Sequence, residues 1–233
     1  MQSFKSNILN QIKSIPEGKI FAFTDLVFAM EKFANVAVIL SNLSKSGDLM
    51  RLEKGAYYKP KHSSLGLGIL PVYQNEQINY LTKKLSGYLT GAYIYNKMGL
   101  TEQVPSIITI ATAYPIRPFK FKKLFIKCVK SYVDTPNDTK TLYLVQILDA
   151  LKDLKHIPGT SPKIAFDKII YLHLSKLSNI DIEEIVYLSM CYPPRTRVVL
   201  CDMLEKTNNL DLQKQLAATI CPTTRFDLSY KTN

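Results

Sequence analysis

The first fifty residues repeat a helical spacing of hydrophobic positions, broken by short interruptions. Residues 3–15 place their apolar side chains on one helical face, and Pro16-Glu17-Gly18 ends that pattern. Residues 20–23 (IFAF) predict a short strand, and Thr24 fits the N-cap of a second, short helix. Residues 35–46 predict a third helix. Its apolar stripe consists of Val36, Ile39, Leu40 and Leu43, and its open face of Asn35, Val38, Ser41, Asn42 and Lys45.

The stretch SKSGDLMRLEKGAYYKP, residues 44–60, predicts the end of the third helix followed by a β-hairpin. Gly47 stands where a helix ends on a glycine, because glycine adopts the left-handed conformation without strain. Lys54-Gly55 fits a two-residue hairpin turn. Tyr57 and Tyr58 point to opposite sides of a strand, so we expect one to pack on the core and the other to meet solvent or DNA. The order helix, strand, helix, helix, hairpin is typical of a winged helix-turn-helix.

The remainder of the chain predicts a mainly helical second domain with a small sheet. Its expected elements are a linker at 60–75, one or two helices at 76–98 broken at Gly87, strands at 107–112 and 124–130, and four or five helices within 139–219. We therefore predict an α+β protein of two domains. Residues 1–61 are expected to form a winged helix-turn-helix DNA-binding domain, and residues 72–233 a mixed, mainly helical domain.

The net charge differs between the two halves of the chain, and this difference bears on the kind of partner that we expect. The net charge is +11, and counting along the sequence gives +4 for residues 1–61, +7 for residues 62–130 and zero for residues 131–233. A basic half joined to a balanced half favours a polyanionic partner, although excess lysine also serves solubility alone. No apolar run approaches the roughly 20 residues that a bilayer requires. We expect a cytoplasmic protein.

The cysteines agree with that expectation. Cys128, Cys191, Cys201 and Cys221 form no CxxC pair and lie in apolar stretches, so we expect reduced core residues.

The candidate DNA contacts fall into two groups. Phosphates require cations and base edges accept short polar side chains. The first group belongs to the third helix and the hairpin: Lys32, Asn35, Ser41, Asn42, Lys45, Arg51, Lys54, Lys59 and Lys61. The second group lies in the stretch YPIRPFKFKK, where prolines predict a loop or hairpin tip: Arg117, Lys120, Lys122 and Lys123. A solvated loop is the alternative for this second group.

We find no catalytic motif in this sequence. The three histidines have no metal-ligand spacing to a cysteine or carboxylate, so no metal or cofactor is expected. Asp149 with Asp153, and Asp181 with Glu184, are spaced on one helix face, where such pairs usually face water. We expect no enzyme, and only a deep pocket lined by Asp149, Asp153 or Asp181 would revive that possibility. A further alternative is a winged-helix protein-interaction module that uses Val38 and the hairpin.

Several motifs resemble one family. ILNQIKSIPEGKIF, LSNLSKSGDLMRLEKGAYYKPK and GYLTGAYIYNKMGLTEQVPSIITIAT are similar to AbiEi-type bacterial transcriptional regulators, the antitoxins of type IV toxin–antitoxin (abortive infection) systems. The later YPPRTRVVLCDMLEK and CPTTRFDLS resemble longer members. The resemblance runs from about residue 7 to 229, and its more specific motifs are Gly99 to Pro105 and Pro193 to Arg197.

This resemblance implies an autorepressor that binds double-stranded DNA at the operator of its own operon. It also implies an antitoxin domain that counters a nucleotidyltransferase-like toxin without forming a stable complex with it. The DNA role falls on the helix from Asn35 to Lys45 and on Arg51, Lys54 and Lys59. The low basic content of that helix departs from the family pattern. The oligomeric state, the operator sequence and the role of Pro193 to Arg197 are left open.

Overall fold

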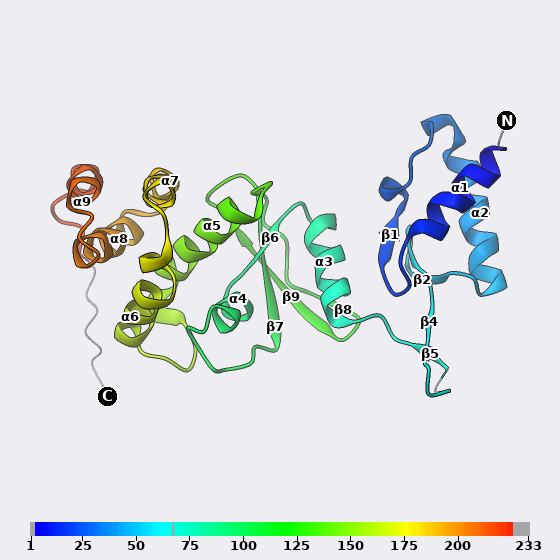
Figure 1. The fold of residues 1–233 in the computed structure, drawn as a ribbon, viewed down its shortest axis with the longest axis horizontal. Helices are drawn as coiled ribbons and strands as arrows, with labels where there is room; N and C mark the ends of the chain where they lie inside the picture. The colour runs from blue at the N-terminus through cyan, green and yellow to red at the C-terminus, as the bar shows by residue number, and fades with distance from the viewer. Residues whose placement is uncertain (1–2, 67, 226–233) are drawn as a thin grey trace. The chain divides into compact units, whose positions relative to one another are not determined.

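A computed structural model describes residues 3–66 and 68–225 of the chain. The fold is α+β, as predicted, and the chain divides into two compact units, Met1–Leu81 and Thr82–Asn233 (Figure 1). The helix α3 (Gln74–Lys84) contains the boundary between the units. Residues 72–81, assigned from the sequence to the second domain, therefore group with the first unit.

The first unit pairs two helices with a three-stranded antiparallel sheet in the order β1-β3-β2. Its elements are α1 (Phe4–Ser14), β1 (Ile20–Ala22), the 3₁₀ turns Phe23–Asp25 and Met30–Lys32, α2 (Phe33–Ser46), β2 (Met50–Glu53) and β3 (Ala56–Tyr58). The two helices bury Ile8, Ile12, Val36 and Leu40 in one core with Phe21 and Tyr57. The predicted apolar stripe thus explains the packing, since a helix of this kind is stabilised by burying its apolar face.

The predicted turns of this unit are confirmed. Gly47 ends α2 in the left-handed conformation, with φ of 86°. Lys54-Gly55 joins β2 to β3, and Gly55 has φ of 83°. Tyr57 packs in the core whereas Tyr58 is half-exposed.

Two predictions for the first unit are wrong. The helix expected at Thr24 is only the 3₁₀ turn Phe23–Asp25, in which Asp25 accepts a hydrogen bond from the Ala22 amide at 2.8 Å. Local capping chemistry is present there, but no run of helix-forming residues follows it. The predicted linker also contains a small antiparallel hairpin, β4 (Lys61–His62) and β5 (Ile69–Leu70).

The second unit places a four-stranded sheet beside a group of helices. The sheet order is β6-β7-β9-β8, formed by β6 (Tyr88–Thr90), β7 (Ile107–Thr112), β9 (Leu124–Lys130) and β8 (Phe119–Phe121). Strands β7 and β9 are parallel, whereas the other pairings are antiparallel. The strands at 107–112 and 124–130 are confirmed. The strand β6 was missed, because it has three residues between Gly87 and Gly91.

A close contact with β7 explains why residue 87, just before β6, is a glycine. A Cβ atom at this position would lie 2.3 Å from the carbonyl oxygen of Ala111 on β7, so only glycine permits this approach.

The predicted helices of the second unit are confirmed. They are α4 (Ala92–Lys97), α5 (Thr139–Lys152), α6 (Pro162–Leu172), α7 (Asn179–Ser189), α8 (Pro194–Lys206) and α9 (Leu210–Ala217). Ser161 caps α6, and Ser178 with Asp181 forms a capping box on α7. Helix α5 is buried over most of its second half and contacts β6, α7 and α8 (Figure 1). It is therefore the central element of this unit.

Arg197 gives the Pro193 to Arg197 motif a structural role. Pro194 begins α8, and the Arg197 guanidinium donates to the carbonyl oxygen of Thr219 at 3.0 Å and to its Oγ1 at 2.9 Å. This contact fastens the chain after α9 to α8.

All four cysteines are free thiols, but only two fit the predicted core positions. Cys201 is buried and Cys128 is half-buried, whereas Cys191 and Cys221 are exposed. The exposed two lie just after α7 and α9, where the chain turns and the apolar spacing no longer reports burial. Among the described residues, no helix is long and apolar enough to cross a membrane.

Candidate nucleic-acid interface

Helix α2 presents the polar face that the sequence predicted. Val36 and Leu40 are fully buried and fix the rotation of the helix. The opposite side is exposed at Asn35, Val38, Ser41, Asn42 and Lys45. This face contains hydrogen-bonding groups of the size that reads base edges, with one cation.

The hairpin β2–β3 follows α2 after three residues and carries the cations Arg51 and Lys54. Both side chains are exposed, and neither has a carboxylate partner among residues 3–66 and 68–225. The register shifts between Arg51 and Glu53, which is a β-bulge at Leu52. Leu52 is buried, whereas the neighbouring Arg51 is exposed. The Arg51 Nε donates to the Glu53 carbonyl oxygen at 3.3 Å.

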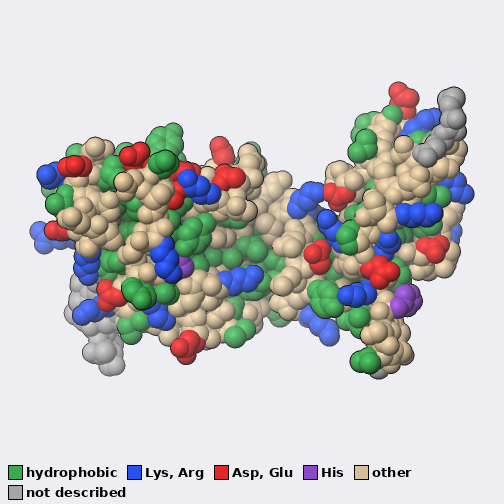
Figure 2. All heavy atoms as spheres, in the orientation of Figure 1, with side chains coloured by type: hydrophobic (Ala, Val, Ile, Leu, Met, Phe, Trp, Pro, Cys, Tyr) green, Lys and Arg blue, Asp and Glu red, His purple; other side chains and the backbone are tan. Residues whose placement is uncertain are grey.

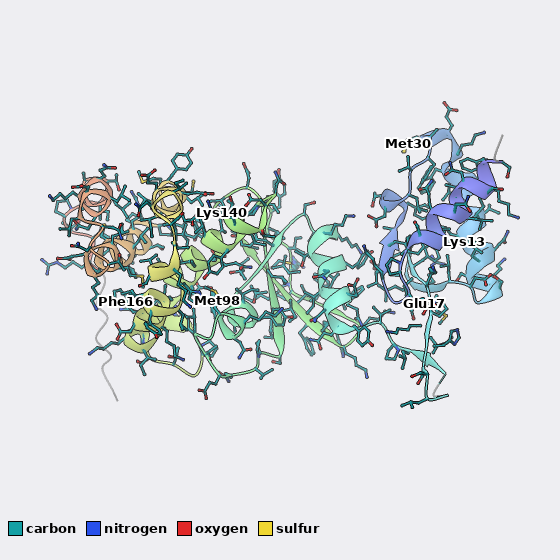
Figure 3. The ribbon with its side chains drawn as sticks, viewed as in Figure 1. Lys13, Glu17, Met30, Met98, Lys140 and Phe166 are labelled. Atoms are coloured by element: carbon teal, nitrogen blue, oxygen red, sulfur yellow. The ribbon has the colours of Figure 1, made fainter. Side chains whose placement is uncertain are left out.

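Lys59 has a different position from the one predicted. Its ammonium donates to the carbonyl oxygens of Lys13 at 2.9 Å and of Ile15 at 2.8 Å, at the C-terminal end of α1. Figure 3 labels Lys13 on this helix. The last carbonyls of a helix lack partners within it and carry partial negative charge, so a lysine there is stabilising. Lys59 therefore closes α1 against β3, and its predicted phosphate contact is not supported.

Replacing Lys59 with methionine should destabilise the first unit by about 1–2 kcal/mol, since charge-assisted hydrogen bonds are lost while the apolar stem is kept. Urea unfolding of the full chain, with hydrogen exchange of the peptide containing residues 4–14, measures this. Lys19→Met is the matched control, because Lys19 is an exposed lysine of the same unit, between α1 and β1. Equal exchange in the two variants would contradict the role of Lys59.

The remaining cations of the first group are exposed. Lys61 lies on β4, with its ammonium 5.7 Å from the centre of the Tyr73 ring. Lys32 is the residue that precedes α2. A cation at a helix N-terminus gains nothing from the helix dipole, so the fold does not account for Lys32.

The second group of cations belongs to the other unit. Lys122 and Lys123 form the two-residue turn between β8 and β9, and Lys122 has positive φ, 53°. Arg117 and Lys120 are exposed nearby in the chain, and the Lys120 ammonium is 5.3 Å from the Phe125 ring centre. Residues 114–118 form a loop and residues 122–123 a hairpin tip, which agrees with the prediction, whereas the strand β8 at 119–121 was not predicted.

On the face drawn in Figure 2, lysine and arginine side chains alternate with aspartate and glutamate over both units. This view shows scattered cations rather than one continuous basic surface.

The conformation of the segment between β1 and α2 was not predicted from the sequence. Gln11 on α1 donates to the Val27 carbonyl oxygen at 3.0 Å and accepts from the Val27 amide at 2.7 Å, so its side chain pairs with the segment as a strand would. This pairing fixes the segment where a helix had been predicted. The side chains of Val27 and Met30 in this segment are each 82% exposed, and Figure 3 labels Met30.

Asp149 contradicts the expectation that the paired carboxylates face water. It is 2% exposed and accepts hydrogen bonds from Thr90 Oγ1 at 2.6 Å and from the Tyr192 hydroxyl at 2.9 Å. Burial raises the pKa of its carboxyl above the ordinary value of 3.8. Asp153 is more exposed and accepts from the Tyr95 hydroxyl at 2.8 Å. The helical period alone could not show this burial, because α5 is covered on nearly every side.

The other carboxylate pair joins two helices. Asp181 forms an ion pair with Lys140 at the start of α5 (Figure 3), and Glu184 accepts from Thr141 Oγ1 at 2.7 Å. Both side chains therefore dock α7 on α5, which gives them a structural role.

The three histidines have different surroundings. His62 is exposed on β4, and His156 follows α5. His173 is buried, with Nε2 donating to the Met98 carbonyl oxygen at 2.9 Å and Nδ1 accepting from the Tyr143 hydroxyl. Burial lowers the pKa of His173, so the ring is neutral at pH 7. Within the described residues, His, Cys, Asp and Glu side chains form no group of three that could hold a metal ion.

Comparison with known proteins gives one family. Residues 7–173 match the family described as "Family of unknown function (DUF6088)", which is more than half of the 233 residues. No curated protein matches. Among solved structures, the chain is similar to the crystal structure of the RV2827C protein from Mycobacterium tuberculosis, with 14% identity and a TM-score of 0.40. That match covers 97% of this chain and 85% of the other.

Proposed function

The chain belongs to the DUF6088 family, and we propose from its own residues that it is a DNA-binding transcriptional autorepressor. In this proposal the first unit is a winged helix-turn-helix. Helix α2 enters the major groove and the β2–β3 hairpin is the wing against the phosphate backbone. The observation that carries the proposal is the exposure of Arg51 and Lys54 on the hairpin, without a carboxylate partner among the described residues.

The side chains of the hairpin and those of α2 suit different contacts with DNA. The hairpin supplies cations for phosphates, which give affinity without sequence preference. Asn35, Ser41 and Asn42 supply the hydrogen-bonding groups for base edges. Because α2 itself carries few cations, most of the affinity should come from the hairpin and from Lys32, Lys45 and Lys61.

The antitoxin role rests on the sequence resemblance, chiefly on Gly99 to Pro105 and Pro193 to Arg197. We propose that the second unit counters a nucleotidyltransferase-like toxin of a type IV system, in a cytoplasmic setting and without a stable complex. Expressing the toxin gene adjacent to this one should arrest growth, and coexpression of this chain should restore it. Persistent arrest would overturn the antitoxin half and leave the DNA half standing.

Binding of the full chain to a labelled duplex of its own promoter should weaken steeply with salt. If three or four phosphates are neutralised, the logarithm of the association constant should fall with the logarithm of salt concentration at a slope of about −3. Fluorescence anisotropy between low and physiological salt measures this slope. Salt-independent binding, or no binding at low salt, would overturn the DNA half of the proposal.

A specific observation also favours a second function, that of a protein-interaction module. Val27 and Met30 are each 82% exposed, and Val38 on α2 is 59% exposed, all in the first unit. Exposed apolar side chains of this size suit a protein surface. A protein captured through this unit at high salt, where phosphate contacts are screened, would support this alternative over DNA binding.

A further inference from the structure

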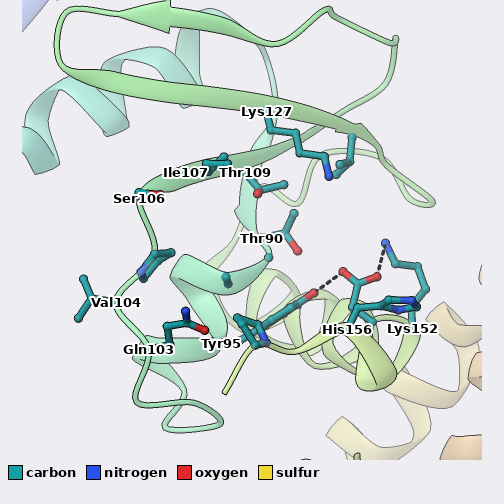
Figure 4. Close-up of a pocket in the computed structure, with 16 residues that line it drawn as sticks. Thr90, Tyr95, Gln103, Val104, Ser106, Ile107, Thr109, Lys127, Lys152 and His156 are labelled. Atoms are coloured by element: carbon teal, nitrogen blue, oxygen red, sulfur yellow. Dashed lines mark hydrogen bonds and ion pairs between the residues drawn. The ribbon is translucent and has the colours of Figure 1, made fainter. Parts of the chain in front are cut away.

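The second unit contains a pocket of about 570 Å³, whose lining includes Gln103 to Pro105 and to which the proposed function assigns no ligand. It lies between strands β7 and β9 on one side and the helices α4 and α5 on the other (Figure 4). Pockets that hold small molecules commonly range from about 300 to 1,000 Å³. This one has the volume for a ligand the size of a mononucleotide.

The charged side chains that line the pocket do not balance one another. Lys152 has its ammonium 3.4 Å from Asp153 Oδ1 and 5.4 Å from the centre of the Tyr132 ring, and its side chain is only 21% exposed. The positive charge of Lys152 is therefore balanced by Asp153. Lys127, which extends from β9 on the opposite wall, has no hydrogen-bond or ion-pair partner in the described parts of the chain (Figure 4). Two lysines against one aspartate leave the lining with net positive charge.

Asp153 is held in a fixed orientation. Its Oδ2 accepts from the Tyr95 hydroxyl at 2.8 Å, while Oδ1 faces Lys152 (Figure 4). The Tyr95 ring is almost fully buried. A carboxylate fixed in this way at a pocket wall can accept hydrogen bonds from a hydroxyl or amino group of a ligand.

The loop that forms the other edge of the pocket is fixed although it has no regular structure. Thr101 Oγ1 donates to the Pro158 carbonyl oxygen and accepts from the Gln103 amide at 3.1 Å, and Asn96 Nδ2 donates to the Thr101 carbonyl oxygen at 3.0 Å. A Cβ atom on Gly159, which has φ of 69°, would lie 3.2 Å from Thr101 Oγ1. These contacts place Gln103 at the pocket before any ligand binds, which limits the entropy cost of binding.

We propose that this pocket binds a small molecule that carries a phosphate or carboxylate group. The anionic group lies against the Lys127 ammonium, and Gln103 and Asp153 hydrogen-bond to polar groups in the rest of the molecule. The proposal is independent of DNA binding, because all of these residues belong to the second unit.

The test uses the full chain with three probes, inorganic phosphate, adenosine 5′-monophosphate and malate, followed by calorimetry. At least one probe should bind with a Kd below about 1 mM. Lys127→Ala should weaken that binding about tenfold or more, since a charge-assisted contact is lost. Tighter binding of the nucleotide than of malate would assign the anion as a phosphate, and the reverse order as a carboxylate.

Lys163→Ala is the matched control, because it removes the same charge from α6 outside the pocket. Its binding should equal that of the parent chain, and the melting temperatures of all variants should agree without ligand. Gln103→Ala should weaken binding of the larger probes more than that of inorganic phosphate. Absence of saturable binding by all three probes, or equal losses in Lys127→Ala and Lys163→Ala, would overturn the proposal.

Discussion

Replacing Arg51 and Lys54 together with alanine should weaken binding to duplex DNA of any sequence by at least about tenfold. Both side chains are exposed on the β2–β3 hairpin, so their loss should remove the proposed phosphate contacts without opening the core. The effect should be the same for the promoter and for an unrelated duplex, because phosphates carry no sequence information. The salt slope should also become shallower by about 2, roughly one unit for each lost contact.

The control for this experiment removes two lysines of equal charge elsewhere. Lys163 and Lys214 are exposed on α6 and α9, and the variant Lys163→Ala/Lys214→Ala should bind DNA as the parent chain does. Equal losses in both double variants would show that only net charge matters, which would contradict the placement of the contact on the hairpin.

In the same experiment, Asn42→Ala tests the proposed contact with a base rather than with phosphates. Asn42 is exposed on α2, where a base contact is proposed. Its loss should cost about 1–3 kcal/mol on the promoter duplex and much less on an unrelated duplex. A uniform loss on both would place Asn42 among the backbone contacts instead.

Asp149→Ala should destabilise the second unit by about 2–4 kcal/mol at mildly acidic pH. Asp149 joins three segments of the unit, since it lies on α5 and accepts from Thr90 on β6 and from Tyr192 after α7. Thr90 and Tyr192 are themselves buried. Truncation therefore removes two buried hydrogen bonds, leaves the Tyr192 hydroxyl only its longer contact with the Val145 carbonyl oxygen at 3.4 Å, and opens a small cavity, all of which cost free energy.

The pH dependence of this variant has a definite sign. Burial raises the pKa of Asp149 in the folded chain above its ordinary value of 3.8, so the folded chain binds more protons than the unfolded chain in that window. The contribution of Asp149 to stability is complete below about pH 3.8 and falls as the pH rises through the folded pKa. The loss caused by Asp149→Ala should therefore be smaller at pH 8 than at pH 5.

Hydrogen exchange of peptides from α5, measured in the full chain at several pH values, gives the local stability that this prediction concerns. Asp167→Ala is a suitable control, because that aspartate is exposed on α6. Asp149→Asn should lose less than the alanine variant and should remove the pH dependence. A loss that grows with pH would contradict the raised pKa.

The outcome for the acidic residues shows where a sequence pattern stops being informative. Asp149 and Asp153 are four residues apart on one helix, and their spacing is the same whether they face water or the interior. Helix α5 is surrounded by β6, α7 and α8, so Asp149 is buried and Asp153 lines a pocket. Only contacts between segments distant in the chain could decide this.

Lys59 shows the same limit among the cations. In the sequence it stands beside Arg51 and Lys54 in one basic hairpin, and all three suit phosphate contacts. In the fold its ammonium reaches the end of α1, more than forty residues earlier in the chain, and binds two carbonyl oxygens.

The sequence by itself determined the elements whose cause is local. The apolar period of α1 and α2, Gly47 at the end of α2, the Lys54-Gly55 turn and the caps of α6 and α7 all depend on residues within a few positions of one another. The tertiary structure alone decided the missing helix after Thr24, the strand β6, the burial of Asp149 and the position of Lys59. Each of these depends on a partner far along the chain, such as Gln11 for the segment at Val27 or Ala111 for Gly87, and local spacing carries no information about such partners.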